Sequence, residues 1–240
     1  MKKIAFLHIP KCGGSTIRSM LSEIVPIHRQ YPVPVGDSSK KEGYRIQKAT
    51  VLDVMSSIEF LDLDFDLFMG NYDWQIVSAF PNDIVILTML RNPVEQLYSQ
   101  FRNFWMDTRR YGVLKDRYEY SGFEGFLDSM DVHRFANQQT RFLGGRYWGH
   151  QANNVSKGVL TSAKRNLRKS SYGLIGQWDS SITLFGDAIG SSLSIVNVEN
   201  RNDKFYPKEL STDIVAKAES IQSYDMSLYE YAQKNFKGKS

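Results

Sequence analysis

The chain has 240 residues, of which 42% are hydrophobic and 23% are charged. These proportions are ordinary for a folded globular protein and argue against a disordered chain. The length suits one domain with a substantial buried core. The formal net charge of +4 is a mild bias toward anionic ligands and falls well short of a nucleic-acid-binding arm, so we expect no nucleic-acid partner.

Cysteine usage and apolar runs bear on the compartment. Cys12 is the one cysteine, so no internal disulfide can form. The apolar run Ile4–Ile9 is short, contains His8, stops at Pro10 and has no small-residue cleavage site after it, which is unlike a signal peptide. No window approaches eighteen uninterrupted apolar residues. We therefore expect no membrane span and a cytoplasmic location.

Strand-like and helix-like patterns alternate along the chain. In order, the first half predicts a strand at Ile4–Ile9, helices at Ser15–Val25 and Val51–Leu61, strands at Asp66–Gly70 and Ile84–Leu90, and a helix from Pro93 to beyond Trp105. The second half predicts a charged loop at Arg109–Gly122, helices at Phe123–Met130, Arg134–Leu143, Lys157–Lys169 and Ser180–Gly190, strands at Tyr172–Gly176 and Leu193–Val198, and one or two helices in Ser211–Phe236. This order favours an α/β fold with a central, mainly parallel sheet flanked by helices. No boundary divides the chain, which we treat as a single domain, 1–240.

The segment between the first strand and the first helix combines features that bind phosphate. It reads Pro10-Lys11-Cys12-Gly13-Gly14-Ser15-Thr16. The glycines let backbone N–H groups approach a ligand and adopt positive φ, and a helix start adds unpaired donors at a positive dipole end. Lys11 adds a charge, and two hydroxyls follow the glycines. The segment therefore predicts an anion nest sized for a phosphate, with a plain strand–helix turn as the alternative.

The spacing of this segment differs from that of ATP-binding P-loops. The Walker A pattern has four residues between its glycines and ends in Lys-Ser/Thr, whereas here Lys11 precedes the glycines. This difference counts against an ATPase or a kinase.

A second anion site is predicted after the strand at Ile84–Leu90. Arg91 follows at the carboxyl end of that strand, where open α/β sheets bind ligands. Asn92 is a candidate cap for the next helix, with Pro93 in its first turn. Ser99 comes eight residues after Arg91, roughly two helical turns, so both side chains can lie on one side of the helix. An arginine fork with a hydroxyl suits a second phosphate, and a surface salt bridge is the alternative.

These two motifs resemble those of sulfotransferases that use 3′-phosphoadenosine 5′-phosphosulfate (PAPS). Phe6–Thr16 resembles the family's 5′-phosphosulfate-binding loop, and Thr88–Ser99 resembles its 3′-phosphate-binding motif. The variant is similar to the carbohydrate branch, which includes the heparan-sulfate 2-O- and 6-O-sulfotransferases and their bacterial relatives. Further resemblance covers Asn137–Leu143, Ala163–Leu167 with Gly173–Gly176, and Asp225–Ala232, so it spans nearly the whole chain. We accordingly expect a three-layer, P-loop-like fold.

The resemblance implies a role for each residue of the two motifs. Lys11 would contact the 5′-phosphosulfate and help the leaving phosphate. Gly13, Gly14, Ser15 and Thr16 would cradle the same group, and Arg91 and Ser99 would hold the 3′-phosphate. Cys12 stands where these loops often have Thr. We interpret it as a small filler whose backbone N–H binds phosphate and not as a nucleophile, since the family transfers its sulfuryl group directly.

The general base is assigned by its position after a strand. The related 2-O and 6-O enzymes have catalytic histidines just after the second strand of their domain, where this chain has Asn71 and Asp73. Asn71 cannot act as a base and is predicted to contact the acceptor. Asp73 can act as one if burial raises its pKa, and its alternative role is to cap the next helix. His28 or His133 remain alternative bases, and we expect His8 to pack behind the phosphate loop.

A basic and aromatic stretch and the four histidines bear on the acceptor and on metal binding. Arg102 begins a basic stretch interleaved with aromatic residues that runs to Tyr120, which suits a saccharide or glycolipid or, alternatively, is a solvated loop. Arg141 is a further acceptor contact by resemblance. The four histidines are scattered, and a sulfuryl group carries less charge than a phosphoryl group, so we expect no metal.

The sequence thus predicts a sulfotransferase that converts PAPS to 3′-phosphoadenosine 5′-phosphate (PAP). The alternatives are a PAP-binding regulator without catalysis and a nucleotide kinase with a degenerate phosphate loop.

Overall fold

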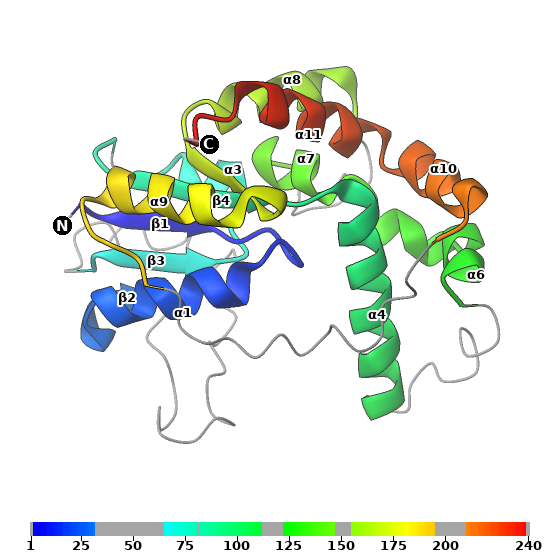
Figure 1. Ribbon diagram of the computed structural model, residues 1–240, viewed down its shortest axis with the longest axis horizontal. Helices are drawn as coiled ribbons and strands as arrows, with labels where there is room; N and C mark the ends of the chain where they lie inside the picture. The colour runs from blue at the N-terminus through cyan, green and yellow to red at the C-terminus, as the bar shows by residue number, and fades with distance from the viewer. Residues whose placement is uncertain are drawn as a thin grey trace.

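A computed structural model describes residues 2–31, 65–80, 82–111, 122–146, 155–194 and 210–238. It contains one five-stranded sheet with the strand order β2-β3-β1-β4-β5, in which every neighbouring pair is parallel (Figure 1). The strands are β1 (Ile4–Leu7), β2 (Gln30–Tyr31), β3 (Leu67–Gly70), β4 (Val85–Leu90) and β5 (Ser171–Leu174). The expected α/β fold with a parallel sheet is confirmed.

Helices surround this sheet. The α-helices of the described residues are α1 (Gly14–Ile24), α3 (Trp74–Val77), α4 (Pro93–Tyr111), α6 (Gly122–Asp128), α7 (Gln138–Leu143), α8 (Lys157–Leu167), α9 (Trp178–Ile189), α10 (Thr212–Ile221) and α11 (Ser223–Asn235). Short 3-10 turns, η1 (Ile27–Arg29), η3 (Met130–Arg134) and η4 (Ile175–Gln177), complete the regular structure. The tail forms two helices, as expected. No helix in the described part of the chain is both long and apolar enough to cross a bilayer.

The structure departs from the sequence prediction at several elements. The helix expected at Arg134–Leu143 begins only at Gln138, because Asn137 adopts a left-handed backbone with φ of 52°. Helix α4 runs to Tyr111 and so takes in the first residues of the expected loop. β2 has two residues, too few for a periodic pattern to reveal.

Three further expectations fall wholly or partly beyond the described residues. At the expected strand Leu193–Val198, the first two residues have no regular structure and 195–198 lie outside the described residues. The helix expected at Val51–Leu61 and the segment 112–121 lie outside them as well.

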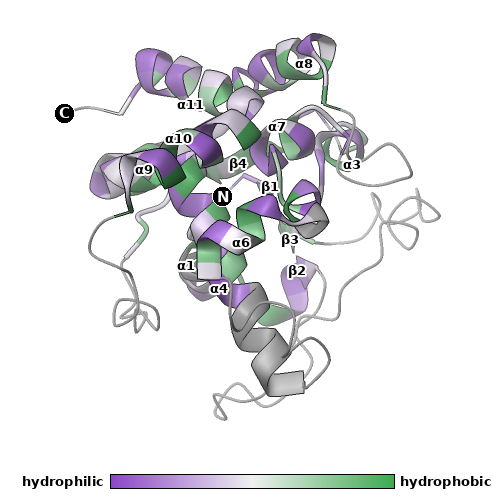
Figure 2. Cartoon of the chain, turned by 90° about the vertical axis from the view of Figure 1, so that its right-hand side faces the viewer, coloured by the Kyte–Doolittle hydropathy of each residue, from purple (hydrophilic) through white to green (hydrophobic). Residues whose placement is uncertain are grey.

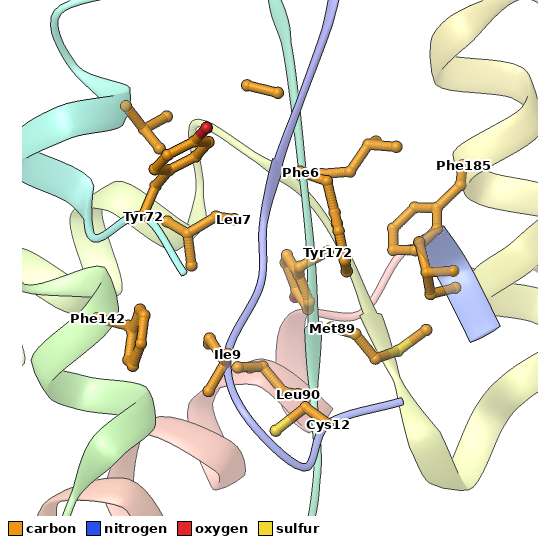
Figure 3. Packing of buried hydrophobic residues seen from close by; sticks show 14 of the residues in the cluster. Phe6, Leu7, Ile9, Cys12, Tyr72, Met89, Leu90, Phe142, Tyr172 and Phe185 are labelled. Atoms are coloured by element: carbon orange, nitrogen blue, oxygen red, sulfur yellow. The ribbon is translucent and has the colours of Figure 1, made fainter. Parts of the chain in front are cut away.

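The core forms around β1, whose four residues are each at most 1% exposed. α9 packs against β5 and β4, while α3 packs against β1 from the opposite face of the sheet (Figure 2). Burial on both faces explains why the strands read as continuous apolar runs rather than alternating ones. The side chains of Ile9, Leu90 and Cys12 gather at the carboxyl end of this core (Figure 3).

A second apolar cluster joins α4, α6, η3 and α10. Its aromatic members include Tyr98, Phe101, Phe123 and Phe126, and the rings of Tyr98 and Phe123 meet edge to face with centroids 4.8 Å apart. These contacts hold the first half of α4 in place beside the sheet. The helix that carries Ser99 is therefore anchored independently of the strand that precedes it.

The strand order also marks where a ligand would bind. From β1 the chain passes to β2 at one edge of the sheet, whereas from β4 it passes to β5 at the other edge. Between β1 and β4 the chain therefore changes direction, and open parallel sheets bind ligands outside the carboxyl ends of such a strand pair. The segment that follows β1 is the loop of residues 8–13, called the Lys11 loop below, and the residue that follows β4 is Arg91.

Candidate anion-binding site

The loop after β1 turns by means of two left-handed residues. Lys11 has a φ of 65° and Gly13 a φ of 72°, on either side of Cys12. Glycine adopts this conformation without strain, but a lysine does so at a cost of about 1–3 kcal/mol. Strain of this kind clusters at ligand sites, and alternating backbone conformations of this type turn successive N–H groups toward one point.

The start of α1 adds the positive end of a helix. Gly13 occupies the N-cap position and offers no side-chain acceptor, and the first turn contains no acidic residue. The N–H groups of a helix's first turn have no intrahelical partner. Ser15 is exposed and Thr16 is half-buried in this turn. The helix end thus remains suited to an anion from outside the chain.

His8 lies directly beneath this helix start. A Cβ added at Gly14 would lie 1.9 Å from Cδ2 of His8, so only glycine fits there. Burial, with the Arg18 charge, lowers the pKa of His8 to about 3, although a side-chain hydrogen bond with Asn71 opposes this shift. The imidazole is therefore uncharged at neutral pH, and its Nδ1 is buried without a hydrogen-bond partner. The expectation that His8 packs behind the loop is confirmed.

Cys12 points into the core and not into the loop's concave side. The residue is 1% exposed, and burial raises the pKa of its thiol, which keeps it protonated. This agrees with its interpretation as a small filler. Its backbone N–H donates to the carbonyl of Ile9 over 3.3 Å, so that group closes the turn.

The two predicted anion motifs meet in space. Nη1 of Arg91 donates to the backbone carbonyl of Lys11 over 3.4 Å, and Nε2 of Gln96 on α4 donates to the carbonyl of Pro10 over 2.9 Å. Nζ of Lys11 in turn donates to Oδ1 of Asn103, also on α4, over 3.2 Å. Segments about 80 residues apart in sequence are thereby tied together at the carboxyl ends of β1 and β4.

Local chemistry explains where α4 begins. The side chain of Asn92 accepts hydrogen bonds from the backbone N–H groups of Val94 and Glu95 at 3.0 and 3.2 Å, so the predicted cap is confirmed. Nε of Arg91 pairs with Oε2 of Glu95 over 3.1 Å. This ion pair is of the kind considered as the alternative role for Arg91, and it keeps the guanidinium beside the start of α4. Ser99 lies two turns along the same helix and is 5% exposed.

Asn71 and Asp73, which follow β3, have different surroundings. The hydrogen bond between Asn71 and His8 brings Asn71 next to the Lys11 loop. Asp73 is 1% exposed, and its Oδ1 accepts from the N–H groups of Gln75 and Ile76 at 3.1 and 3.4 Å. It therefore caps α3, which confirms the alternative role considered for it.

Two of the predicted acceptor contacts, Arg102 and Arg141, have different surroundings in the structure. Arg102 is half-buried on α4, next to the Asn103 that contacts Lys11. Arg141 is 4% exposed, and its Nη1 donates to the carbonyls of Arg134 and Ala136 at 3.0 and 3.5 Å. Arg141 thus braces η3 against α7. The rest of the basic and aromatic stretch, beyond residue 111, lies outside the described residues.

The structure adds site residues that sequence reasoning missed. Gln96, Asn103 and Gln139 hold the Lys11 loop or Arg91 through hydrogen bonds. Gln96 and Gln139 lie inside two of the motifs described above, where other residues drew attention. Asn103 belongs to no motif and carried no sequence signal. Among the described residues, no three His, Cys, Asp or Glu side chains gather as metal ligands would.

Neither a protein-family model nor a curated protein matches this chain.

Proposed function

We propose that the chain is a PAPS-dependent sulfotransferase acting on an acceptor hydroxyl. The observation that carries the proposal is the contact between the Lys11 loop and Arg91 at the carboxyl ends of adjacent central strands. Two cationic sites on neighbouring strand ends match a nucleotide with phosphates at both its 5′ and 3′ positions. ATP carries its phosphates in a single chain and needs no second site.

The surrounding fold supports the same proposal. A strand–loop–helix unit at the central β1, with helices on both faces of the sheet, is the arrangement of a three-layer P-loop-like domain. We propose that the chain has this architecture. The position of Lys11, ahead of the glycines, distinguishes the loop from Walker A and favours sulfuryl over ATP-dependent phosphoryl transfer.

The proposed reaction is direct in-line transfer. The bond between sulfur and the bridging oxygen of the 5′-phosphate breaks while a bond from the acceptor oxygen to sulfur forms. Lys11 and the α1 start stabilise the charge that gathers on the leaving phosphate. Gly13, Gly14, Ser15 and Thr16 hold that phosphate, and Arg91 and Ser99 hold the 3′-phosphate. Positioning of this kind supplies much of the rate in analogous phosphoryl transfers.

The acceptor must also lose a proton. Asp73 is a candidate base by its position in the sequence, but the two N–H groups it accepts stabilise its charged form and weaken it as a base. The capping role of Asp73 is therefore favoured, and the variant Asp73→Asn separates capping from base catalysis. Among the proposed acceptor contacts, Asn71 hydrogen-bonds His8 beneath the loop, and Arg102 precedes the Asn103 that contacts Lys11. A saccharide or glycolipid is proposed on family resemblance, and no metal or nucleic acid takes part in the scheme.

Nucleotide titration tests the donor. We expect the protein to bind PAP more tightly than ATP in isothermal titration, with or without Mg²⁺. Tight ATP binding without PAP binding would replace the proposal by a nucleotide kinase. Incubation with radiolabelled PAPS and a panel of saccharides and glycolipids then tests catalysis. PAP binding without transfer to any acceptor would favour a non-catalytic PAP-binding regulator.

Replacement of Lys11 tests the site. We expect Lys11→Ala to abolish sulfuryl transfer, because it removes the charge beside the leaving phosphate. The matched control is Lys169→Ala, which removes an exposed lysine from the turn just after α8 and leaves the loop intact. Transfer by Lys11→Ala at the control's rate would remove Lys11 from the mechanism.

A further inference from the structure

Arg91 is held by its backbone from the side of α7. Nε2 of Gln139 donates to the carbonyl of Arg91 over 2.9 Å, and Oε1 of Gln139 accepts from the N–H of Arg91 over 3.1 Å. Gln139 is 1% exposed. One buried side-chain amide thus satisfies both backbone groups of the residue that supplies the second cationic site.

This clamp acts on a short linker that regular structure does not fix. β4 ends at Leu90 and α4 begins at Pro93, so Arg91 belongs to neither element. A backbone in that position can rotate with little loss of strand or helix hydrogen bonding. Because the guanidinium lies several bonds from the backbone, a small rotation there displaces it substantially. The amide of Gln139 prevents such a rotation.

Gln139 is itself held by α11. The carboxylate of Asp225 accepts the backbone N–H groups of Gln139 and Thr140 at 3.0 and 2.6 Å, one at each oxygen. Asp225 is fully buried, so its hydrogen bonds do not compete with bulk water. A carboxylate from a distant helix therefore caps the start of α7 and sets the position from which Gln139 reaches Arg91.

We propose that Gln139 is a positioning residue that aims Arg91 at the 3′-phosphate and thereby sets the preference for 3′-phosphorylated nucleotides. The inference rests on the proposed function, since it assumes that Arg91 binds that phosphate. Gln139 touches no reacting atom. Its effect falls more on the 3′ end of the nucleotide than on the 5′ end, because Gln96 and Asn103 hold the Lys11 loop even where the contact of Arg91 with the Lys11 carbonyl is lost.

Titration with PAP and with AMP, which lacks the 3′-phosphate, separates these two ends. We expect Gln139→Met, an apolar replacement of similar length, to weaken PAP binding by roughly tenfold, as for loss of a charge-assisted hydrogen bond, and to weaken AMP binding much less. The matched control is Gln30→Met. Gln30 is an equally buried glutamine whose amide holds backbone carbonyls of Ser22 and Val25, away from Arg91. The Gln30→Met variant should keep the wild-type ratio of PAP to AMP affinity.

A double-mutant cycle tests whether Gln139 acts through Arg91. Once Arg91→Met has removed the guanidinium, adding Gln139→Met should weaken PAP binding no further. An additional tenfold loss in that background would overturn the proposal. So would an unchanged PAP-to-AMP ratio in Gln139→Met, provided that the wild type prefers PAP. Equal wild-type affinity for PAP and AMP would instead overturn the proposed function itself.

A second variant keeps the test valid if Gln139→Met does not fold. Gln139→Glu still accepts the Arg91 N–H, but only its protonated form can also donate to the Arg91 carbonyl. We expect its PAP-to-AMP ratio, measured relative to the wild type at each pH, to recover as the pH is lowered. A ratio that stays at the wild-type value at every pH would contradict the proposal.

Discussion

At the scale of single residues, the conformation of the loop after β1 depends on small residues at two positions, Cys12 and Gly14. Gly14 has no Cβ, and the imidazole of His8 occupies the space where one would lie. Cys12 is small enough to be buried beside Ile9 and Leu90 (Figure 3). Both choices let the backbone of the loop sit close to the sheet, so that its N–H groups can face an anion.

A methyl group at position 14 should disturb this packing. We expect Gly14→Ala to lower the free energy of unfolding by about 1–3 kcal/mol, because the His8 ring must move, and to weaken PAP binding. Denaturant unfolding and titration measure the two effects. The control is Gly158→Ala, where a Cβ would meet only Oγ of Ser156, at 3.6 Å.

The double variant His8→Ala, Gly14→Ala locates the cause. Removal of the imidazole should restore part of the stability that Gly14→Ala loses, since the clash is then gone. If the two losses simply add, the imidazole is not the group that excludes a side chain at position 14.

At the scale of elements, short helices are held by side chains from their surroundings. α3 has four residues, too few to be stable alone, and Asp73 satisfies two N–H groups at its start. α7 has six residues and is capped from outside by Asp225. Each cap also places a neighbouring residue of the site, Asn71 in one case and Gln139 in the other.

Asp73 allows a test that separates capping from base catalysis. Asparagine caps a helix about as well as aspartate but cannot accept the acceptor's proton. We expect Asp73→Asn to preserve the unfolding free energy and to keep transfer within about tenfold of the wild type, because two cap bonds weaken this carboxylate as a base. A loss of roughly 10²–10⁴-fold with unchanged stability would identify Asp73 as the base. Asp73→Ala, by contrast, should lose about 0.5–2 kcal/mol through the missing cap.

At the scale of the whole molecule, two apolar clusters stand on either side of the proposed donor site. One surrounds the sheet, and the other joins α4 to α6 and α10. α4 contributes to the second cluster while its first turns carry contacts to the Lys11 loop. The site therefore lies where the two clusters meet, and its geometry depends on both.

The prediction of a single domain can be tested through this arrangement. Phe126 is fully buried in the second cluster, so Phe126→Ala should cost about 3–5 kcal/mol. Phe142→Ala, at an equally buried position of the sheet cluster, is the matched variant. We expect both to shift one and the same cooperative transition, followed by circular dichroism and by fluorescence. Separate transitions for the two variants would show that the clusters unfold as independent units.

The sequence was informative wherever the structure depends on neighbouring residues. The burial of β1, the cap of α4 by Asn92 and the helical character of the tail all follow from patterns a few residues long. The same reasoning missed the break at Asn137, because a left-handed asparagine leaves no periodic trace. Arg141 stays a predicted acceptor contact, and the structure adds that its side chain donates to carbonyls of its own neighbourhood.

The sequence by itself thus determined a parallel α/β protein with a glycine-rich loop at its first strand and an arginine at a later strand end. Only the tertiary structure decided that these two segments touch, because their contact depends on β1 and β4 being neighbours in the sheet. It likewise decided that Gln139 and Asp225 support Arg91, since hydrogen bonds between residues 48 and 86 positions apart follow from packing and not from local pattern.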